Sequence, residues 1–209
     1  MHAASPATSA RPRRIVALAM AALLVAAVAV LTHGAAARML AGAASGGDTT
    51  GVIASALDAA PSAADGAVDS RISVFDEVPA VSGLDPELLA AVRAAARDAA
   101  EDGVRFVVNS GWRSARLQEQ LLDDAVSRYG SREEAARWVA TPETSAHVTG
   151  EAIDLGPWDA LDWLAQHGAD YGLCQIYANE PWHYELRSAA GTEGCPSQYP
   201  DPTHDPRLR

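Results

Sequence analysis

The stretch DPELLAAVRAAARDAAEDGVRFVVNS, residues 85–110, predicts a helix that leads directly into a strand. Asp85 suits the N-cap of the helix, Pro86 suits its first position, and Gly103 ends the helical pattern. Residues 104–109 then alternate, imperfectly, between apolar and polar side chains, which is typical of a strand. The apolar residues of the helix repeat along one face: Leu88, Leu89, Val92 and Ala96. This helix and strand therefore start a folded core.

Further elements follow without a regular alternation of helix and strand. Ser131 and Glu134 form a capping box that predicts a helix through about Ala140. The apolar patterns predict two more helices and three short strands. These helices cover residues 115–129 and 158–167, and these strands cover 151–156, 173–177 and 182–187. The order of elements favours an α+β fold, with a mostly antiparallel sheet flanked by helices in a single domain.

The N-terminal segment has the features of a membrane-targeting sequence. Arg11, Arg13 and Arg14 precede an uncharged apolar run over residues 15–31, which is long for a signal-peptide core and short for a membrane span. We expect residues 1–40 to form a signal anchor, with a cleaved signal peptide as the alternative. Because the basic flank comes first, the rest of the chain is expected outside the cytoplasm, anchored to the cell membrane or secreted.

Composition divides the remainder of the chain in two. Residues 41–70 are rich in Ala, Gly, Ser, Thr and Asp and lack aromatic residues, which predicts a flexible tether. Residues 71–209 are expected to form the folded domain, with a proline-rich C-terminal tail.

The chain has only two cysteines, so Cys174 and Cys195 are expected to form a disulfide outside the cytoplasm. The formal net charge of −11 and the absence of lysine argue against nucleic acid as a partner.

Four polar residues have the chemistry of a catalytic metal site. His147 and Asp154 are seven residues apart, and Glu180 and His183 follow in the segment EPWH. Two imidazoles and a carboxylate suit zinc, and a second carboxylate beside an open coordination position suits a hydrolase. Taken one at a time, each residue has a more ordinary explanation as a cap, a surface carboxylate or a packed histidine.

The combined pattern resembles a known family. S-x-H-x-x-G-x-A-x-D over residues 145–154, followed by E-x-W-H over residues 180–183, is similar to the zinc D,D-peptidases of the VanY and D-alanyl-D-alanine carboxypeptidase family, the M15 peptidases. The segment SGWRS over residues 110–114 and the following Gln118 also resemble that family. The resemblance covers roughly residues 71–190 and implies the hedgehog/DD-peptidase-like fold.

The resemblance also implies roles for individual residues. It makes His147, Asp154 and His183 zinc ligands and Glu180 the catalytic base. It places Arg113 near the scissile carbonyl or the terminal carboxylate of the substrate. Ser145 and Gln118 are expected to contact the substrate, and Gly150 is expected where the chain takes a positive φ or approaches a neighbour closely.

Three functions remain open from the sequence. The first is a zinc D,D-carboxypeptidase that removes the terminal D-Ala from peptidoglycan stem peptides, and the second is an endopeptidase of the same family. The third is a zinc-bearing but inactive wall-binding module, which Glu180 disfavours because a binding module needs no carboxylate beside the metal. Ala146, where the family often has glutamate, and a short connection between Tyr177 and Glu180 leave the choice of peptide open.

Overall fold

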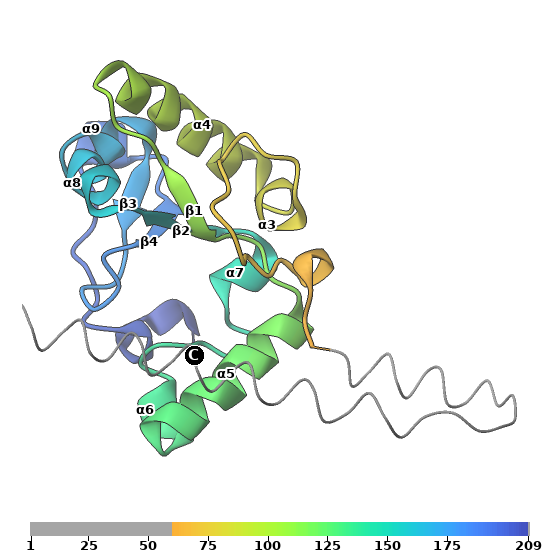
Figure 1. Cartoon of the computed structure of the whole chain (residues 1–209). Helices are drawn as coiled ribbons and strands as arrows, with labels where there is room; N and C mark the ends of the chain where they lie inside the picture. Colours follow the sequence, from red (N-terminus) through yellow and green to blue (C-terminus); the bar gives the residue numbers. More distant parts are fainter. Residues whose placement is uncertain (1–59, 209) are drawn as a thin grey trace, which may run out of the picture. The chain divides into compact units, whose positions relative to one another are not determined.

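The sheet contains four strands, and each pairing between them is antiparallel. The computed structural model of the chain describes residues 60–208, and within them the strand order is β1-β2-β4-β3. The strands are β1 Val107–Ser110, β2 Ala152–Gly156, β3 Leu173–Gln175 and β4 His183–Leu186. The expected α+β fold with an antiparallel sheet is therefore confirmed (Figure 1).

Two long helices form where the local sequence signals are strongest. In α4 the Asp85 side chain accepts hydrogen bonds from the backbone N–H groups of Glu87 and Leu88, as its N-cap position predicts. In α5 the Ser114 hydroxyl caps the backbone N–H of Leu117. The helices in chain order are α3 Pro79–Ser82, α4 Pro86–Glu101, α5 Ala115–Tyr129, α6 Arg132–Ala135, α7 Ala146–Thr149, α8 Trp158–His167 and α9 Ala190–Glu193. The 3-10 turns are η1 Ala63–Asp65, η2 Gly168–Tyr171, η3 Pro202–His204 and η4 Pro206–Leu208.

The helix predicted to run from Ser131 to about Ala140 is wrong in length. Its cap forms, because the Ser131 hydroxyl accepts from the backbone N–H of Glu134, but α6 ends at Ala135. Two carbonyls beyond it are taken by side chains from elsewhere in the fold, Arg137 by Asn179 and Ala140 by Gln118. The backbone N–H groups of Trp138 and Val139 both donate to the carbonyl of Ala135, so the regular helical pattern stops there, and the two long-range contacts hold the segment that follows.

One face of the sheet is packed against helices and holds the main core. Ile153 and Leu155 of β2 and Tyr184 of β4 are fully or almost fully buried there. They pack with apolar residues of α4 and α8, including Leu88 and Leu164. Because side chains alternate along a strand, the residues between them point to the opposite face. On β2 and β4 those residues are Asp154, His183 and Glu185.

The folded domain includes residues that precede the boundary expected at Arg71. Asp65, in the turn η1, binds the hydroxyl of Ser114 and the guanidinium of Arg116 at the start of α5. Within residues 60–208 no helix has both the length and the apolar character needed to cross a bilayer. The apolar run over residues 15–31 lies outside the described residues, and so does most of the expected tether.

The C-terminal segment returns to the sheet and is held there by the predicted disulfide. Cys174 of β3 and Cys195 are joined, which confirms that expectation. Figure 1 shows the segment beyond Cys195, in dark blue, between the sheet and the α5–α6 pair.

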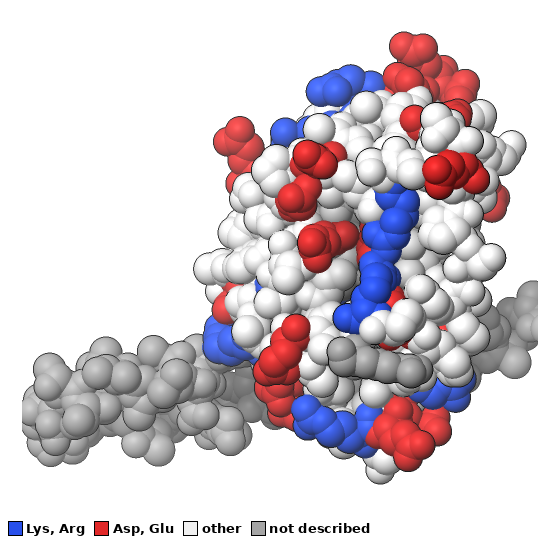
Figure 2. Space-filling view, turned by 180° about the vertical axis from the view of Figure 1, so that it is seen from behind, with Lys and Arg blue, Asp and Glu red and all other residues white. Residues whose placement is uncertain are grey.

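On the face in Figure 2 basic side chains form a narrow row with acidic side chains on both sides of it.

Candidate metal centre

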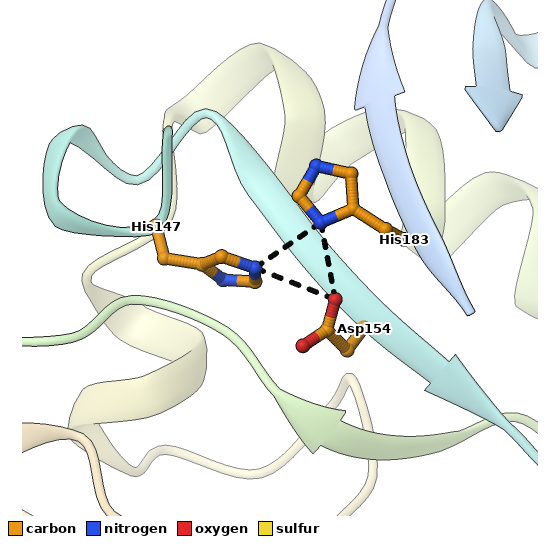
Figure 3. Close-up of side chains that lie close together, drawn as sticks. All are labelled: His147, Asp154 and His183. Atoms are coloured by element: carbon orange, nitrogen blue, oxygen red, sulfur yellow. Dashed lines mark hydrogen bonds and ion pairs between the residues drawn. The ribbon is translucent and has the colours of Figure 1, made fainter. Parts of the chain in front are cut away.

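Asp154 and His183 lie directly opposite each other on neighbouring strands. They are register partners in the β2–β4 pair, and both point away from the core. His147 reaches them from α7. His147 Nε2 lies 3.3 Å from Asp154 Oδ1 and 3.3 Å from His183 Nδ1, and His183 Nδ1 lies 3.2 Å from Asp154 Oδ1 (Figure 3). The structure therefore brings together the three residues expected to bind metal.

Gly150 explains how His147 and Asp154 meet. Its φ of +80° lies in the left-handed region, and a Cβ there would lie 2.5 Å from the carbonyl oxygen of Gly83. Both expectations for this glycine are confirmed, the positive φ and the close approach. His147 itself lies in the four-residue helical turn α7, and Asp154 lies in the middle of β2.

The second nitrogen of each imidazole has a fixed acceptor. His147 Nδ1 lies 2.8 Å from the carbonyl oxygen of Gly111, which can only accept, so this nitrogen donates. His183 Nε2 lies 3.2 Å from Glu185 Oε1. Burial raises the pKa of Glu185, but hydrogen bonds with His183 and Arg207 outweigh it and hold that pKa well below its usual range, so the carboxylate accepts. The ring nitrogens left to bind a metal ion beside Asp154 are therefore His147 Nε2 and His183 Nδ1.

The electrostatics of the three residues differ. Burial lowers the pKa of His147, and this favours its neutral form. Burial also acts to lower the pKa of His183, but hydrogen bonds to Asp154 and Glu185 raise it to about 9. Burial acts to raise the pKa of Asp154, yet the two histidines and Arg113 hold it well below its usual range. The cluster therefore contains one ionised carboxylate that is compensated from several sides.

Glu180 lies beside this cluster with an unused oxygen. Its side chain is buried, and Oε2 lies 3.9 Å from His183 Nδ1. Among the described residues, Oε1 is a buried oxygen without a hydrogen-bond partner. Burial raises the pKa of Glu180 to about 7. A buried carboxylate oxygen without a partner is expensive in a folded protein, which points to a group that is bound here in the working protein.

Arg113 is half-buried against the cluster and is held on three sides. Its Nη2 donates to Asp154 Oδ2 at 2.9 Å, its Nε donates to the Ser110 hydroxyl, and its Nη1 donates to Gln118 Oε1. Gln118 is buried and uses its amide nitrogen on the carbonyl of Ala140, so its contacts here position Arg113. Substrate binding by Gln118 stays a prediction. A guanidinium has five N–H groups, and these three contacts leave two for another ligand.

The three donor atoms fit zinc. Ligand atoms on a tetrahedral zinc, each about 2.0–2.1 Å from the ion, lie about 3.3 Å from one another. The three separations between His147, Asp154 and His183 are 3.2, 3.3 and 3.3 Å. Two imidazole nitrogens and a carboxylate are also the donor chemistry that zinc accepts, and Glu180 lies beside them.

The cluster opens into a cleft with a volume of about 410 Å³. Ser145 lines this cleft, and its contact with the substrate stays a prediction. At the rim, the rings of Tyr129 and Trp138 stack with centroids 5.8 Å apart. Pro202 of the C-terminal segment also lines the cleft. The cleft walls thus come from α5, the segment 138–147 that includes the start of α7, Asp154 of β2, the segment 177–183 that leads into β4, and the tail.

Two contributors to the site were missed in the sequence. The backbone carbonyl of Gly111 fixes the ring of His147, and no side-chain motif can signal a backbone acceptor. Glu185 follows His183 by two residues, and this spacing in a strand places both on one face, so alternation would have found it.

Comparison with known proteins places the chain in a family. The family model described as VanY, D-alanyl-D-alanine carboxypeptidase, matches residues 82–188. A D-alanyl-D-alanine carboxypeptidase of Enterococcus faecalis is 32% identical over 108 residues, covering 40% of this chain and 40% of that protein. The chain therefore matches less than half the length of this curated relative.

Two solved structures share the fold. One is a zinc-bound mutant of the vancomycin resistance D,D-pentapeptidase VanY, with a TM-score of 0.51, 24% identity, and coverage of 59% of this chain and 82% of that one. The other is VanYB in complex with D-alanine-D-alanine, with a TM-score of 0.51, 24% identity, and coverage of 61% and 82%. At this identity the likeness concerns the fold alone. The family match spans more than half of the chain and includes every residue of the metal cluster, so this protein belongs to the VanY family of D-alanyl-D-alanine carboxypeptidases.

Proposed function

We propose that this protein is a zinc-dependent D,D-carboxypeptidase that removes the terminal D-Ala from peptidoglycan stem peptides. The observation that carries the proposal is the cluster of His147 Nε2, Asp154 Oδ1 and His183 Nδ1, with the unpartnered Glu180 Oε1 beside it. This arrangement combines three donors for a metal with a carboxylate that has no structural partner, which is what a hydrolase needs and a binding module does not.

His147, Asp154 and His183 would hold the zinc ion. When bound, zinc supplies Lewis acidity, lowering the pKa of a water molecule and polarising a carbonyl group. Gly111 and Glu185 keep the two imidazoles in the tautomers that present a lone pair to the ion.

Glu180 is proposed as the proton carrier. It takes a proton from the attacking water while the water oxygen bonds to the peptide carbonyl carbon. It then gives that proton to the amine nitrogen as the carbon–nitrogen bond breaks, and free D-alanine leaves. A pKa near 7 in its buried position suits both directions of transfer, because the group can hold or release a proton near neutral pH.

Arg113 is proposed to bind the terminal carboxylate of the peptide or the oxyanion formed from its carbonyl. Its guanidinium is fixed by Asp154, Ser110 and Gln118, so its two remaining N–H groups have a defined direction. A fixed guanidinium can bind a carboxylate through two parallel hydrogen bonds. An internal peptide bond has no such carboxylate, so this feature favours a carboxypeptidase over an endopeptidase.

The site of action is proposed to be outside the cytoplasm, with the N-terminal segment in the membrane. The basic residues before the apolar run of residues 15–31 support this orientation. The Cys174–Cys195 disulfide supports an oxidising compartment. Secretion after signal cleavage remains the alternative to a membrane anchor.

The direct test is the reaction with a purified stem pentapeptide ending in D-Ala-D-Ala. The zinc-loaded protein should release one free D-alanine per peptide, and a chelator should stop the reaction until zinc is added back. Mass spectrometry identifies the products. Cleavage inside the stem or at a cross-bridge would support the endopeptidase instead, and intact peptide at all zinc concentrations would support the inactive binding module.

A further inference from the structure

The C-terminal segment extends beyond the residues that the family model matches and yet reaches the metal cluster. We define residues 195–208 as the C-terminal strap. The family match ends at residue 188, so the strap lies outside it. One end of the strap is fixed to β3 by the Cys174–Cys195 disulfide. Its backbone then pairs with the segment before Glu180, where the backbone N–H of Ala178 donates to the carbonyl of Tyr199.

Side chains of residues outside the strap bind it at two further points. Asp201 accepts from Arg137 Nε at 3.0 Å, near the end of α6. Asp205 is fully buried and accepts from the hydroxyl of Tyr177 at 3.0 Å. Asp205 also binds the guanidinium of Arg207 through both of its oxygens. The strap therefore has a defined path across the sheet, and that path sets the position of Arg207.

Arg207 binds the carboxylate that fixes His183. Its Nη1 lies 2.6 Å from Glu185 Oε2, and its Nη2 lies 3.3 Å from Glu185 Oε1. Oε1 is the oxygen that accepts from His183 Nε2. Arg187 also contacts Glu185, but at Oε2 alone. Arg207 is therefore the arginine that addresses both oxygens and fixes the plane of the carboxylate that faces the histidine.

Fixing that plane has a consequence for the metal. Glu185 is 2% exposed, and its free rotation would let Nε2 of His183 lose its acceptor. The ring of His183 must present Nδ1, not Nε2, to Asp154 and His147. Outer-shell carboxylates of this kind hold a ligating imidazole in one tautomer and orientation, and losing one weakens metal binding by about 10–100-fold.

We propose that Arg207 is a positioning residue for zinc: through Glu185 it orients His183, so the metal centre of this chain depends on the strap as well as on the family domain. This inference rests on the proposed function, because it needs His183 to bind zinc. Arg207 does not line the 410 Å³ cleft, so it acts on the metal rather than on the peptide.

The test is a zinc affinity measurement on the full chain, by competition with a chromophoric chelator. Arg207→Gln should raise the zinc Kd by about 10-fold or more, whereas Arg187→Gln should change it by less than about threefold. In a chain that already carries Glu185→Gln, Arg207→Gln should raise the zinc Kd by less than about a further twofold, because the carboxylate through which Arg207 acts on His183 is gone. Arg105→Gln, an exposed change beside β1, is the control and should leave the Kd unchanged.

Thermal unfolding of the zinc-free variants separates zinc binding from folding. If Arg207 had a purely structural role, Arg207→Gln would lower the unfolding temperature, and its effect on the zinc Kd would be the same with and without Glu185→Gln. At saturating zinc, the KM of Arg207→Gln for the stem peptide should equal that of the wild type. An unchanged zinc Kd in Arg207→Gln, or the same loss with and without Glu185→Gln, would overturn the inference and leave the proposed function standing. A wild-type chain that bound no zinc would overturn both.

Discussion

His183 is held between two carboxylates that contact opposite edges of its ring. Nδ1 lies 3.2 Å from Asp154 Oδ1, and Nε2 lies 3.2 Å from Glu185 Oε1. Asp154 is the register partner of His183 on the neighbouring strand, and Glu185 follows it by two positions on its own strand. Strand pairing and strand alternation thus build this part of the site. A change at Asp154 and a change at Glu185 are expected to have different effects.

Replacing a proposed ligand should remove zinc. His147→Ala, Asp154→Ala and His183→Ala each delete one of three donors, so we expect zinc affinity to fall on the order of 1000-fold, beyond the loss expected for an outer-shell partner. Elemental analysis after dialysis measures this. His167→Ala, on α8 and away from the cluster, is the matched control and should keep its zinc. Full zinc occupancy in any of the three alanine variants would remove that residue from the ligand set.

Arg113 gives a prediction about the end of the substrate. If it binds the terminal carboxylate, amidating the C-terminus of the peptide should lower kcat/KM. The corresponding loss of transition-state binding free energy should be on the order of 2–4 kcal/mol. The same amidation should have little effect on Arg113→Ala, whose rate is already low, because the partner of the carboxylate is gone. Steady-state rates for both peptides on both proteins, with zinc content checked, measure the coupling. Equal kcat/KM for free-acid and amidated peptides on the wild type would favour the endopeptidase.

Gly150 and Gly130 form a natural pair for testing the loop that carries His147. Both have positive φ, +80° and +85°, but a Cβ at Gly150 would meet the carbonyl of Gly83 at 2.5 Å, whereas a Cβ at Gly130 would meet nothing within 4 Å. Gly130→Ala should cost roughly 1 kcal/mol of unfolding free energy, from the left-handed conformation alone. Gly150→Ala should cost on the order of 2–4 kcal/mol, because backbone must move as well.

Urea unfolding of the zinc-free proteins measures both losses. Zinc affinity should fall only in Gly150→Ala, since the displaced backbone carries His147 away from Asp154. Equal losses of stability for the two alanine variants would mean that the contact with Gly83 is not what fixes this loop.

Asp201 gives the strap a pH-dependent contact. Burial acts to raise its pKa, but hydrogen bonds from Thr203, His204 and Arg137 lower it to about 2. Because the folded pKa lies below the unfolded value of about 3.9, the stabilisation is present above roughly pH 4 and is lost as the pH falls through 2. Asp201→Asn should therefore cost roughly 1–2 kcal/mol at pH 7, discounted because Arg137 is largely exposed.

The gap in unfolding free energy between wild type and Asp201→Asn should shrink as the pH falls from about 4 to about 2. Asp124→Asn, an exposed change on α5, serves as the control and should show no gap at either pH. A gap that stayed constant down to pH 2 would show that the ionised form of Asp201 does not stabilise the strap.

Local signals in the sequence predicted the parts of the fold that local contacts determine. The start of α4 after Asp85 follows from its cap and proline, and the bounds of α5 follow from apolar spacing, and the structure agrees. The helix after Ser131 is shorter than predicted, because beyond Ala135 the N–H groups of Trp138 and Val139 both donate to the Ala135 carbonyl and the regular pattern stops. Asn179 and Gln118, distant in sequence, hold the segment that follows, and such contacts leave no mark in a short window.

The candidate site divides in the same way. His147, Asp154, Glu180 and His183 were found because the combined motif marks them, and the structure brings them together. Arg207 lies 24 residues after His183 and has no motif, and its contact with Glu185 exists only because the strap folds back over the sheet. The supporting residues of a site are set by tertiary contacts, which one sequence does not display.

Glu180→Gln tests the central claim most directly, because it separates the metal from the chemistry in one protein. The change keeps the shape of the side chain and removes its ability to carry a proton. We measure zinc content and D-alanine release from the same sample, on a stem pentapeptide ending in D-Ala-D-Ala, beside the wild type. We expect full zinc occupancy, with D-alanine release reduced by at least about 100-fold, the lower end of what a general acid–base group contributes. Release at the wild-type rate, or loss of zinc as complete as in His183→Ala, would contradict that claim.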